Sequence, residues 1–275
     1  MDTFGALQDL DFPVGVVVSD ADGVLDTYGD TSTSFAWASV TKLLSATATL
    51  VAVERGMVAL DDPAGPEGAT VRHLLAHASG VPFDSGATLS APGRRRVYSN
   101  LGIELLAEHV AEAVGRDFET WVEETVIEPL GMSTVLIEGS PAAGATGSAD
   151  DLGVLGRELL RPTLVGPELF AEATTVVFPG LSGVLPGFGR QENNDWGLGF
   201  EIRDHKSPHW TGASSSPRTF GHFGQRGSFL WVDPDAGLAT AFLGAKPFGE
   251  WAARVWPRLT DDILAAHAGE ASTSR

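Results

Sequence analysis

Residues 39–55 read SVTKLLSATATLVAVER, and this stretch decides the fold. Its residues favour a helix, which Gly56 would end, and apolar side chains cover much of its surface. A helix that is apolar nearly all round is normally buried, so we expect it between two layers of the protein. Lys42 is exceptional within it, because the chain has only two other lysines, Lys206 and Lys246. A lone charge on a buried helix requires an explanation.

Strand-like segments lie on both sides of this helix. Before it, residues 14–18 and 24–28 are rich in β-branched side chains and are joined by a hairpin turn. After it, the strand pattern returns over 196–202, 219–223, 229–232 and 238–243. The intervening helical patterns cover 70–77, 101–114, 118–127 and 149–160, the last with Ser148 as a cap. A final amphipathic helix over 251–267 would close over the sheet, and Gly269–Arg275 would form a frayed tail.

This order of strands, helices and strands predicts a mixed α/β (α+β) fold. An antiparallel sheet flanked by helices would be built from the two ends of the chain, with a mainly helical lobe inserted between them. We expect the sheet lobe to comprise residues 1–37 and 191–275, and the helical lobe residues 38–190. Concave sites form where two such lobes meet, so we expect the chemistry in the cleft between them.

Composition excludes several functions. The chain has 275 residues, of which 36 are acidic and 18 basic, and the net charge of -18 repels phosphate backbones and anionic lipids. We therefore expect neither a nucleic acid nor a membrane as a partner. With no cysteine, thiolate chemistry and disulfides are excluded. The N-terminus lacks a basic segment followed by an apolar one, which predicts a cytoplasmic protein. The oligomeric state has no signal in the sequence.

Ser39 and Lys42 form the first candidate site. Their three-residue spacing places the hydroxyl and the amine on one face of the helix. A partly desolvated lysine can have its pKa lowered enough to take the serine proton, and the helix N-terminus favours a developing oxyanion. Alone, the same pattern also fits a capping serine followed by a surface lysine.

Two further motifs follow along the chain. Tyr98-Ser99-Asn100 stands at the expected start of a helix, and the chain has only two tyrosines. His222-Phe223-Gly224-Gln225 lies on an expected strand whose glycines would allow close approach of a ligand. Taken singly, the second motif fits equally well a glycine-rich strand with a core histidine.

In this order, Ser-x-x-Lys, Tyr-x-Asn and a basic residue-x-Gly resemble the signature of the penicillin-binding protein and serine β-lactamase superfamily. The variant is most similar to the branch of class C β-lactamases, DD-peptidases and esterases. The similar segments are residues 35–60, 71–80, 98–115, 128–132, 196–200 and 221–233.

This resemblance implies an enzyme that works through an acyl-enzyme without a cofactor. Ser39 would attack the carbonyl, Lys42 would share its proton, and Asn100 would orient the substrate and the lysine. Tyr98 would act as general base and then as acid. Because a neutral phenol is too weak a base near neutral pH, this role requires the positive charge of Lys42 to lower the pKa of Tyr98.

The resemblance also implies an oxyanion site between the backbone amides of Ser39 and Gln225. His222 and Gly224 would take the places of the lysine and glycine in the family's Lys-Thr-Gly motif. Phe223 replaces its threonine and removes a hydroxyl, and histidine is a less dependable cation than lysine. We therefore expect weaker recognition of a substrate carboxylate.

These departures favour a serine hydrolase of the esterase type, acting on a small ester, amide or β-lactam-like molecule. A DD-peptidase or a weak class C-like β-lactamase is the alternative. A non-catalytic binding protein on the same fold is a second alternative, although such a protein would be expected to lose a catalytic side chain.

Two other sequence patterns are weaker evidence for a functional site. His73 and His77 have a zinc-like spacing, but Leu74 stands where a zinc protease would have its glutamate, so we expect no metal site. Arg94–Arg96 could steer an anionic substrate. A short basic run in a loop is, however, typical of a solvated face, and we do not count these arginines as catalytic.

Overall fold

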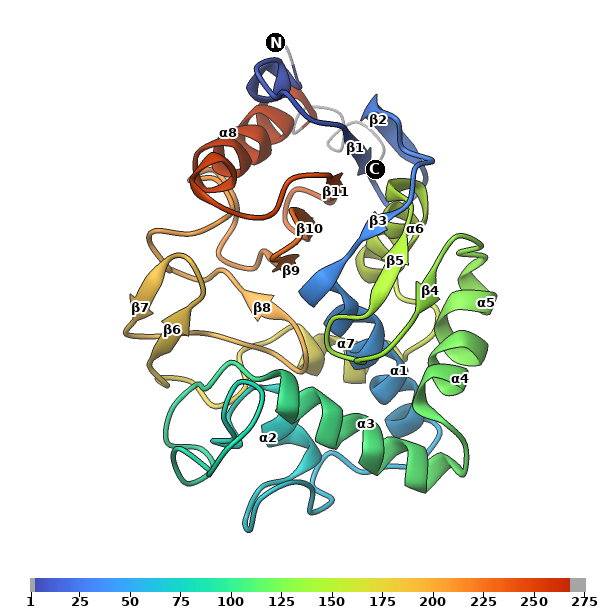
Figure 1. Ribbon diagram of the computed structural model, residues 1–275, viewed down its shortest axis with the longest axis vertical. Coiled ribbons are helices and arrows are strands. Elements are labelled where there is room, and N and C mark those ends of the chain that lie inside the picture. Colours follow the sequence, from blue (N-terminus) through green and yellow to red (C-terminus); the bar gives the residue numbers. More distant parts are fainter. Residues whose placement is uncertain (1–2, 268–275) are drawn as a thin grey trace.

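The computed structural model describes residues 3–267, and a six-stranded antiparallel sheet forms its centre (Figure 1). The strand order is β2-β1-β11-β10-β9-β8. The strands are β1 (Val14–Ser19), β2 (Val24–Gly29), β8 (Glu201–Ile202), β9 (Phe220–Gly224), β10 (Ser228–Asp233) and β11 (Leu238–Gly244). Strand β1 pairs with β11, so the two ends of the chain share one sheet, as predicted. The predicted tail, Gly269–Arg275, lies outside the described residues.

Both faces of this sheet are buried. On β10, Phe229 and Trp231 enter one apolar cluster, whereas Leu230 and Val232 enter the other. The alternation follows from the two-residue period of a strand. Helix α8 (Glu250–His267) covers the first face and places Trp256 in its cluster. Helix α6 (Ala149–Leu160) covers the second.

Helix α6 approaches the sheet closely because it has glycines at the contact. A Cβ at Gly153 would lie 2.9 Å from a methyl carbon of Val17, and one at Gly156 would lie 3.1 Å from the Cβ of Ala239. The helix begins as predicted, since the Ser148 hydroxyl accepts a hydrogen bond from the amide of Asp151. Helix α6 lies within the predicted helical lobe of residues 38–190, yet it packs on the sheet.

Helix α1 (Thr41–Glu54) is central, and its residues 41–52 are all buried, while the remaining elements are helices and two small sheets. The helices are α2 (Val71–Leu75), α3 (Asn100–Val114), α4 (Phe118–Val122), α5 (Glu128–Leu130) and α7 (Pro167–Ala173), with a π-helical turn over Glu123–Ile127. Strands β3 (Phe35–Ala36), β5 (Ala145–Gly147) and β4 (Leu136–Ile137) form a small sheet, and β6 (Gly183–Leu185) pairs with β7 (Gly189–Gln191). No helix among the described residues has the length and hydropathy to cross a bilayer.

The expected strand over residues 196–202 is wrong over most of its length. Only Glu201 and Ile202 form strand β8. Gly197 and Gly199 divert the segment before it: a Cβ at Gly197 would lie 2.0 Å from the carbonyl of Ala173, and Gly199 has a φ of +88°. Gly197 thus lets the chain pass closely over the end of α7, and Gly199 lets it pass closely over Ala46 of α1.

Candidate active site

Ser39 lies in a 3₁₀ turn, Ala38–Val40, that leads directly into α1. The preceding residue, Ala38, has a φ of +46°, a left-handed conformation that is strained for a residue with a Cβ. Its neighbour Trp37 is held from two sides. The Trp37 amide donates to the carbonyl of Ala145 at 2.9 Å, and the Ser228 hydroxyl donates to the Trp37 carbonyl at 2.7 Å. The surrounding strands thus maintain the strained turn that presents Ser39.

The end of β9 lies next to this turn because residue 224 is glycine. A Cβ at Gly224 would lie 2.4 Å from the Trp37 carbonyl oxygen and 3.1 Å from the Cβ of Ala38. A larger residue would therefore separate β9 from Ser39. The following residue, Gln225, lines the same slot as Ser39.

Lys42 is buried, and its ammonium group has three neutral partners. Its Nζ lies 3.3 Å from Ser39 Oγ, 2.6 Å from Asn100 Oδ1 and 3.0 Å from the carbonyl oxygen of Ala142. Burial lowers the pKa of Lys42 to about 7, against the opposing field of Asp84 and Glu104. A substantial fraction of the amine is therefore neutral near pH 7 and able to accept a proton.

The Tyr98-Ser99-Asn100 motif stands at the start of α3, as predicted. The Ser99 hydroxyl caps this helix by accepting a hydrogen bond from the amide of Gly102 at 2.8 Å. Asn100 uses both ends of its amide: Oδ1 accepts from Lys42, and Nδ2 donates to Asp84 Oδ1 at 3.0 Å. The helix start thus holds the lysine in place.

Tyr98 lies among rings and beside the lysine. Lys42 Nζ is 4.8 Å from the centre of its ring, and the rings of His77 and His222 are 4.8 and 5.6 Å away. Burial raises the pKa of Tyr98 above its ordinary value, and a hydrogen bond with Ser39 opposes this shift only in part. The resting group is therefore a phenol, and the expected phenolate is wrong for this state.

His222 is neutral in the structure. Burial, together with the nearby charge of Lys42, lowers its pKa to about 3. Its Nδ1 lies 2.6 Å from the carbonyl of Phe223, to which it donates, and its Nε2 is buried without a partner among residues 3–267. The position that carries a lysine in the family thus carries no charge here.

A narrow slot of about 70 Å³ brings most of the predicted residues together. It is lined by Ser39, Phe83, Tyr98, Leu185, Pro186, Trp196, Glu201, His222, Phe223 and Gln225. Lys42 does not line the slot but contacts Ser39, which does, and Asn100 in turn contacts Lys42. The polar lining residues of the slot are Ser39, Tyr98, Glu201, His222 and Gln225, and the rest of its wall is apolar.

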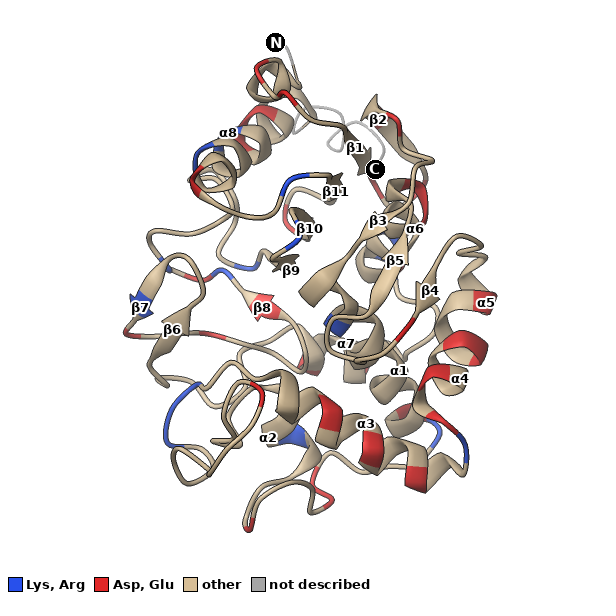
Figure 2. Cartoon of the chain, in the orientation of Figure 1, with Lys and Arg blue, Asp and Glu red and all other residues tan. Residues whose placement is uncertain are grey.

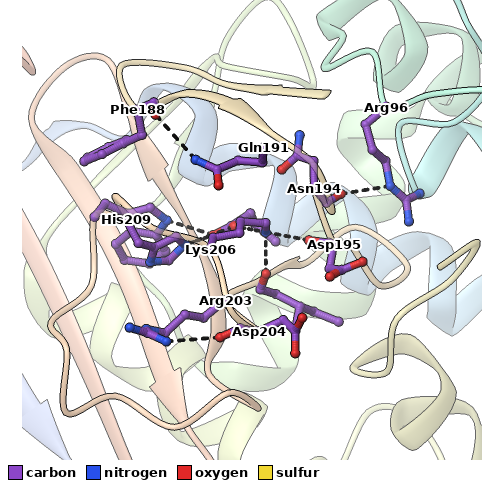
Figure 3. A network of polar contacts seen from close by, with 12 residues as sticks. Arg96, Phe188, Gln191, Asn194, Asp195, Arg203, Asp204, Lys206 and His209 are labelled. Atoms are coloured by element: carbon purple, nitrogen blue, oxygen red, sulfur yellow. Dashed lines mark hydrogen bonds and ion pairs between the residues drawn. The ribbon is translucent and has the colours of Figure 1, made fainter. Parts of the chain in front are cut away.

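Sequence reasoning missed Glu201, which lines this slot but is engaged in a buried network. Figure 3 labels Lys206 and His209, two other members of this network. The Glu201 carboxylate accepts hydrogen bonds from Lys206, from His209 Nε2 at 3.1 Å and from Trp210 Nε1 at 2.8 Å. Burial alone would raise the pKa of Glu201, but the charges of His209 and Lys206 together lower it below its ordinary value. No local motif marks this cluster. Glu201 lies in strand β8, whereas Lys206, His209 and Trp210 lie in the irregular loop after it, so their spacing has no helical or strand period.

His73 and His77 have separate surroundings. The ring of His73 stacks on Phe178 at 4.4 Å. His77 packs edge-on against Trp196 at 4.5 Å, and its Nδ1 accepts from the amide of Ser99 at 3.3 Å. His77 therefore supports the segment that carries Tyr98.

The expectation of a solvated face is wrong for Arg96, which is buried. Its guanidinium donates to four backbone carbonyls: those of Ala76, Val177, Phe178 and Asn194 (Figure 3 shows the bond to Asn194). Burial lowers the pKa of Arg96 to about 10, with Asp195 opposing the shift. Arg96 is a structural cross-link, whereas Arg94 and Arg95 are exposed.

The antiparallel sheet between helices, with a serine and a buried lysine at the start of the central helix, defines the class of β-lactamase-fold serine hydrolases. The model of the Beta-lactamase family matches residues 14–265. The chain belongs to this family, and the resemblance and the fold class inferred from the sequence are confirmed.

Known relatives agree with this assignment. A crystal structure of a β-lactamase from Mycobacterium bovis is 54% identical, with a TM-score of 0.92, and the match covers 93% of this chain and 95% of that one. D-alanyl-D-alanine-carboxypeptidase/endopeptidase AmpH from Escherichia coli is 30% identical in an alignment of 141 positions, and the match covers 38% of this chain and 37% of AmpH. The chain thus matches little more than a third of that protein. The hydrolase EstCE1, which has promiscuous acyltransferase activity, shares the fold at 17% identity, with a TM-score of 0.73 over 92% of this chain and 93% of that one.

Proposed function

We propose that this protein is an esterase-like serine hydrolase, with Ser39 as nucleophile and Lys42 as the base that activates it. The observation that carries this proposal is the 3.3 Å contact between Lys42 Nζ and Ser39 Oγ, made by a lysine whose pKa burial lowers to about 7. A neutral amine at this distance is placed to take the hydroxyl proton as the serine attacks.

Acylation would proceed as follows. Ser39 Oγ bonds to the carbonyl carbon while its proton passes to Lys42, and the oxyanion is held by the amides of Ser39 and Gln225. The bond to the leaving group then breaks. The phenol of Tyr98 gives its proton to the departing heteroatom and regains one from the Lys42 ammonium, which restores both groups. Tyr98 thus acts as an acid in this step, and Lys42 as the base.

Deacylation would use the same groups in reverse. A water molecule attacks the acyl carbon and transfers a proton to the Tyr98 and Lys42 pair, and Ser39 leaves with a proton returned from that pair. Asn100 holds Lys42 within reach throughout, because Asn100 Oδ1 accepts from Nζ at 2.6 Å and a backbone carbonyl fixes the other side.

The substrate preference rests on the slot itself. Phe223 supplies no hydroxyl, and its ring packs into the apolar cluster beneath α8. His222 is neutral because burial lowers its pKa to about 3. Both features favour a small ester that presents no carboxylate at β9 over a substrate that needs one bound there.

Labelling with a fluorophosphonate, followed by peptide mapping, tests the nucleophile. We expect the label on Ser39 in the folded protein and its loss in Ser39→Ala. Ser45, six residues further along the chain and within α1, is the internal control, because its hydroxyl donates to the carbonyl of Pro141 rather than contacting Lys42. A label on another serine, or none on folded protein, would refute the assignment.

The esterase assignment is tested by comparing kcat/KM for a short-chain activated ester with that for a chromogenic cephalosporin. We expect the ester to be preferred. A preference for the cephalosporin by more than about tenfold would favour the β-lactamase alternative, and release of D-alanine from a D-alanyl-D-alanine peptide at a higher kcat/KM than the ester would favour the peptidase. Labelling of Ser39 without turnover of any of the three substrates would favour the binding protein.

A further inference from the structure

A larger groove of about 500 Å³ adjoins the catalytic slot. It shares Phe83, Tyr98 and Pro186 with the slot, but not Ser39 or Gln225. The groove therefore begins at the tyrosine and leads away from the proposed oxyanion amides. A substrate bound at Ser39 could extend into it only past Tyr98.

The walls of the groove are two segments that the fold holds together. One wall is the chain before α3 and the other is the β6–β7 hairpin, which lie on the same side of the molecule (Figure 1). The Arg96 amide donates to the carbonyl of Ser182 at 2.9 Å, and a Cβ at Gly183 would lie 2.7 Å from the Cβ of Arg96. With its side chain bound to carbonyls, Arg96 fixes the floor of a preformed groove.

The surface of the groove is apolar. Phe83, Leu89 and Val184 line it, and all three are large hydrophobic residues with about half of their surface exposed, at 48, 54 and 60%. Val97 and Pro186 complete the apolar lining. Exposed apolar side chains gathered along one groove mark a binding surface more often than a stretch of ordinary surface.

The charge of the groove is opposite to that of the chain. Among the described residues that line it there is no Asp or Glu, although the protein has twice as many acidic as basic residues. Basic residues occur on β7 and on the loop before α3, while acidic residues gather along α3, α4 and α5 (Figure 2). The groove is thus a local basic region on an acidic protein.

Arg95 and Arg190 supply the free positive charge. Within residues 3–267 neither forms an ion pair with a carboxylate, and both are exposed at the groove. Arg95 Nη2 donates to the carbonyl of Leu89 at 3.1 Å, which anchors its guanidinium on one wall, while Arg190 lies on the other. Arg96 differs, because its donors are already used. Two guanidinium groups across an apolar groove are suited to a carboxylate at the end of an apolar chain.

We infer that this groove binds the leaving group of the substrate, an apolar chain that ends in a carboxylate. The inference rests on the proposed function. With the carbonyl oxygen at the amides of Ser39 and Gln225, the leaving heteroatom faces Tyr98, and the groove begins at Tyr98. The neutral His222 leaves the slot without the cation that the family places there, and Arg95 and Arg190 supply one at a greater distance.

The test compares ω-acetoxyhexanoate with its neutral counterpart ω-acetoxyhexanamide, by acetate release that depends on Ser39. We expect kcat/KM to be about tenfold higher for the carboxylate, the scale of two partly exposed ion pairs, and the preference to decline as ionic strength rises. In Arg95→Gln/Arg190→Gln the two substrates should become about equal. Arg94→Gln, which removes a neighbouring exposed arginine outside the groove, is the matched control and should keep the preference.

Each outcome discriminates. Equal hydrolysis of both substrates by the parent protein would overturn the inference and leave the proposed function standing. A preference that survives in the double variant would overturn the role of the two arginines. Monoethyl adipate and its neutral counterpart ethyl adipamate form a second pair, in which the carboxylate is on the acyl side. If the enzyme prefers monoethyl adipate but shows no preference between the two acetoxy esters, the leaving-group assignment is overturned. Absence of Ser39-dependent turnover of every ester would refute the proposed function, and the inference with it.

Discussion

The protein buries two of its three lysines, and the two have opposite surroundings. Lys42 is bound by an amide oxygen, a backbone carbonyl and the Ser39 hydroxyl, all of them neutral. Lys206 is paired with the carboxylate of Glu201 and also donates to the carbonyls of Asp195 and Ile202. Each lysine contacts a residue that lines the slot, Glu201 for Lys206 and Ser39 for Lys42. Only Lys42 therefore contacts the candidate nucleophile.

The difference shows that burial alone does not make a lysine a base. Burial lowers the pKa of both ammonium groups, but the carboxylate of Glu201 opposes the shift at Lys206 through a direct ion pair. At Lys42 the opposing charges of Asp84 and Glu104 act through space, and the pKa reaches about 7. A catalytic amine therefore needs desolvation together with partners that have no full negative charge.

Replacing Lys42 gives the largest expected effect. Lys42→Met removes the base and fits the apolar surroundings of α1, so turnover should fall by about 10³-fold, within the range for a positioned proton-transfer group. Stability should not fall in parallel. Because the pKa of Lys42 is lowered to about 7 from 10.5, the unfolded parent binds more protons between these values, and the parent gains stability as pH rises through that window.

Thermal melting with turnover measurements checks this prediction. The melting temperature of Lys42→Met relative to the parent should be highest below pH 7 and should decline as pH rises toward 10.5. Near-full ester turnover by a folded Lys42→Met protein would reassign the base to His222 or Tyr98.

Replacing Lys206, unlike replacing Lys42, should lower the stability of the fold. Lys206→Met removes the ion-pair partner of the buried Glu201 carboxylate and leaves it only the hydrogen bonds from His209 and Trp210. The unfolding free energy should therefore fall by about 3–5 kcal/mol, as for other broken buried ion pairs. The matched control is Glu201→Gln/Lys206→Met, which removes both charges and should recover most of the loss. Denaturant unfolding measures both variants. A loss below about 1 kcal/mol in the single variant would contradict a structural ion pair.

Tyr98→Phe separates the proton donor from the base. The ring and its contacts with His77 and His222 remain, and only the hydroxyl is lost, so the fold should persist while turnover falls by about 10²-fold. The loss should be smaller for an ester with a good leaving group, which needs less protonation, than for an alkyl ester. A mutant that melts like the parent and retains nearly full alkyl-ester turnover over a pH series would exclude Tyr98 as the acid.

The pH dependence of kcat/KM is the smallest expected change in rate, and it reports directly on the protonation of Lys42. Since the protonated amine cannot accept the serine proton, the rate should fall about tenfold for each pH unit below the lysine pKa of about 7 and level off above it. Steady-state rates measured over a pH series on a neutral ester check this. A rate that is constant through neutral pH, in a protein that stays folded, would show that Lys42 does not titrate in this range.

Regular elements were predictable wherever the signal was local. The helix over residues 149–160 was found with its serine cap, because the cap and the helix period lie within one segment. Strands over 14–18 and 238–243 were found because β-branched and apolar residues dominate them. The β6–β7 hairpin and helix α7 were missed, since three-residue strands and a seven-residue helix depend on their neighbours for stability.

The residues of the candidate site likewise fall into those that a local motif identifies and those that it does not. Ser39, Lys42 and Tyr98 could be picked out because each lies in a short motif whose spacing has a chemical meaning. Glu201 and its partners could not, because what makes them a buried network is the packing of the loop after β8. Nor could Arg96 be distinguished from Arg94 and Arg95 by sequence, since its four carbonyl partners come from residues between 76 and 194.

The sequence by itself determined the order of the main strands and helices, the central apolar helix, and the three motifs that identify the family. These depend on the side-chain period and on spacing along a few residues. Only the tertiary structure decided how the whole site is protonated. A lowered pKa at Lys42 follows from the apolar helix that carries it, but burial moves the pKa values of Tyr98 and His222 in directions that no local pattern indicates, because desolvation depends on atoms brought from distant parts of the chain. It also decided which arginine is a cross-link and which two face the groove.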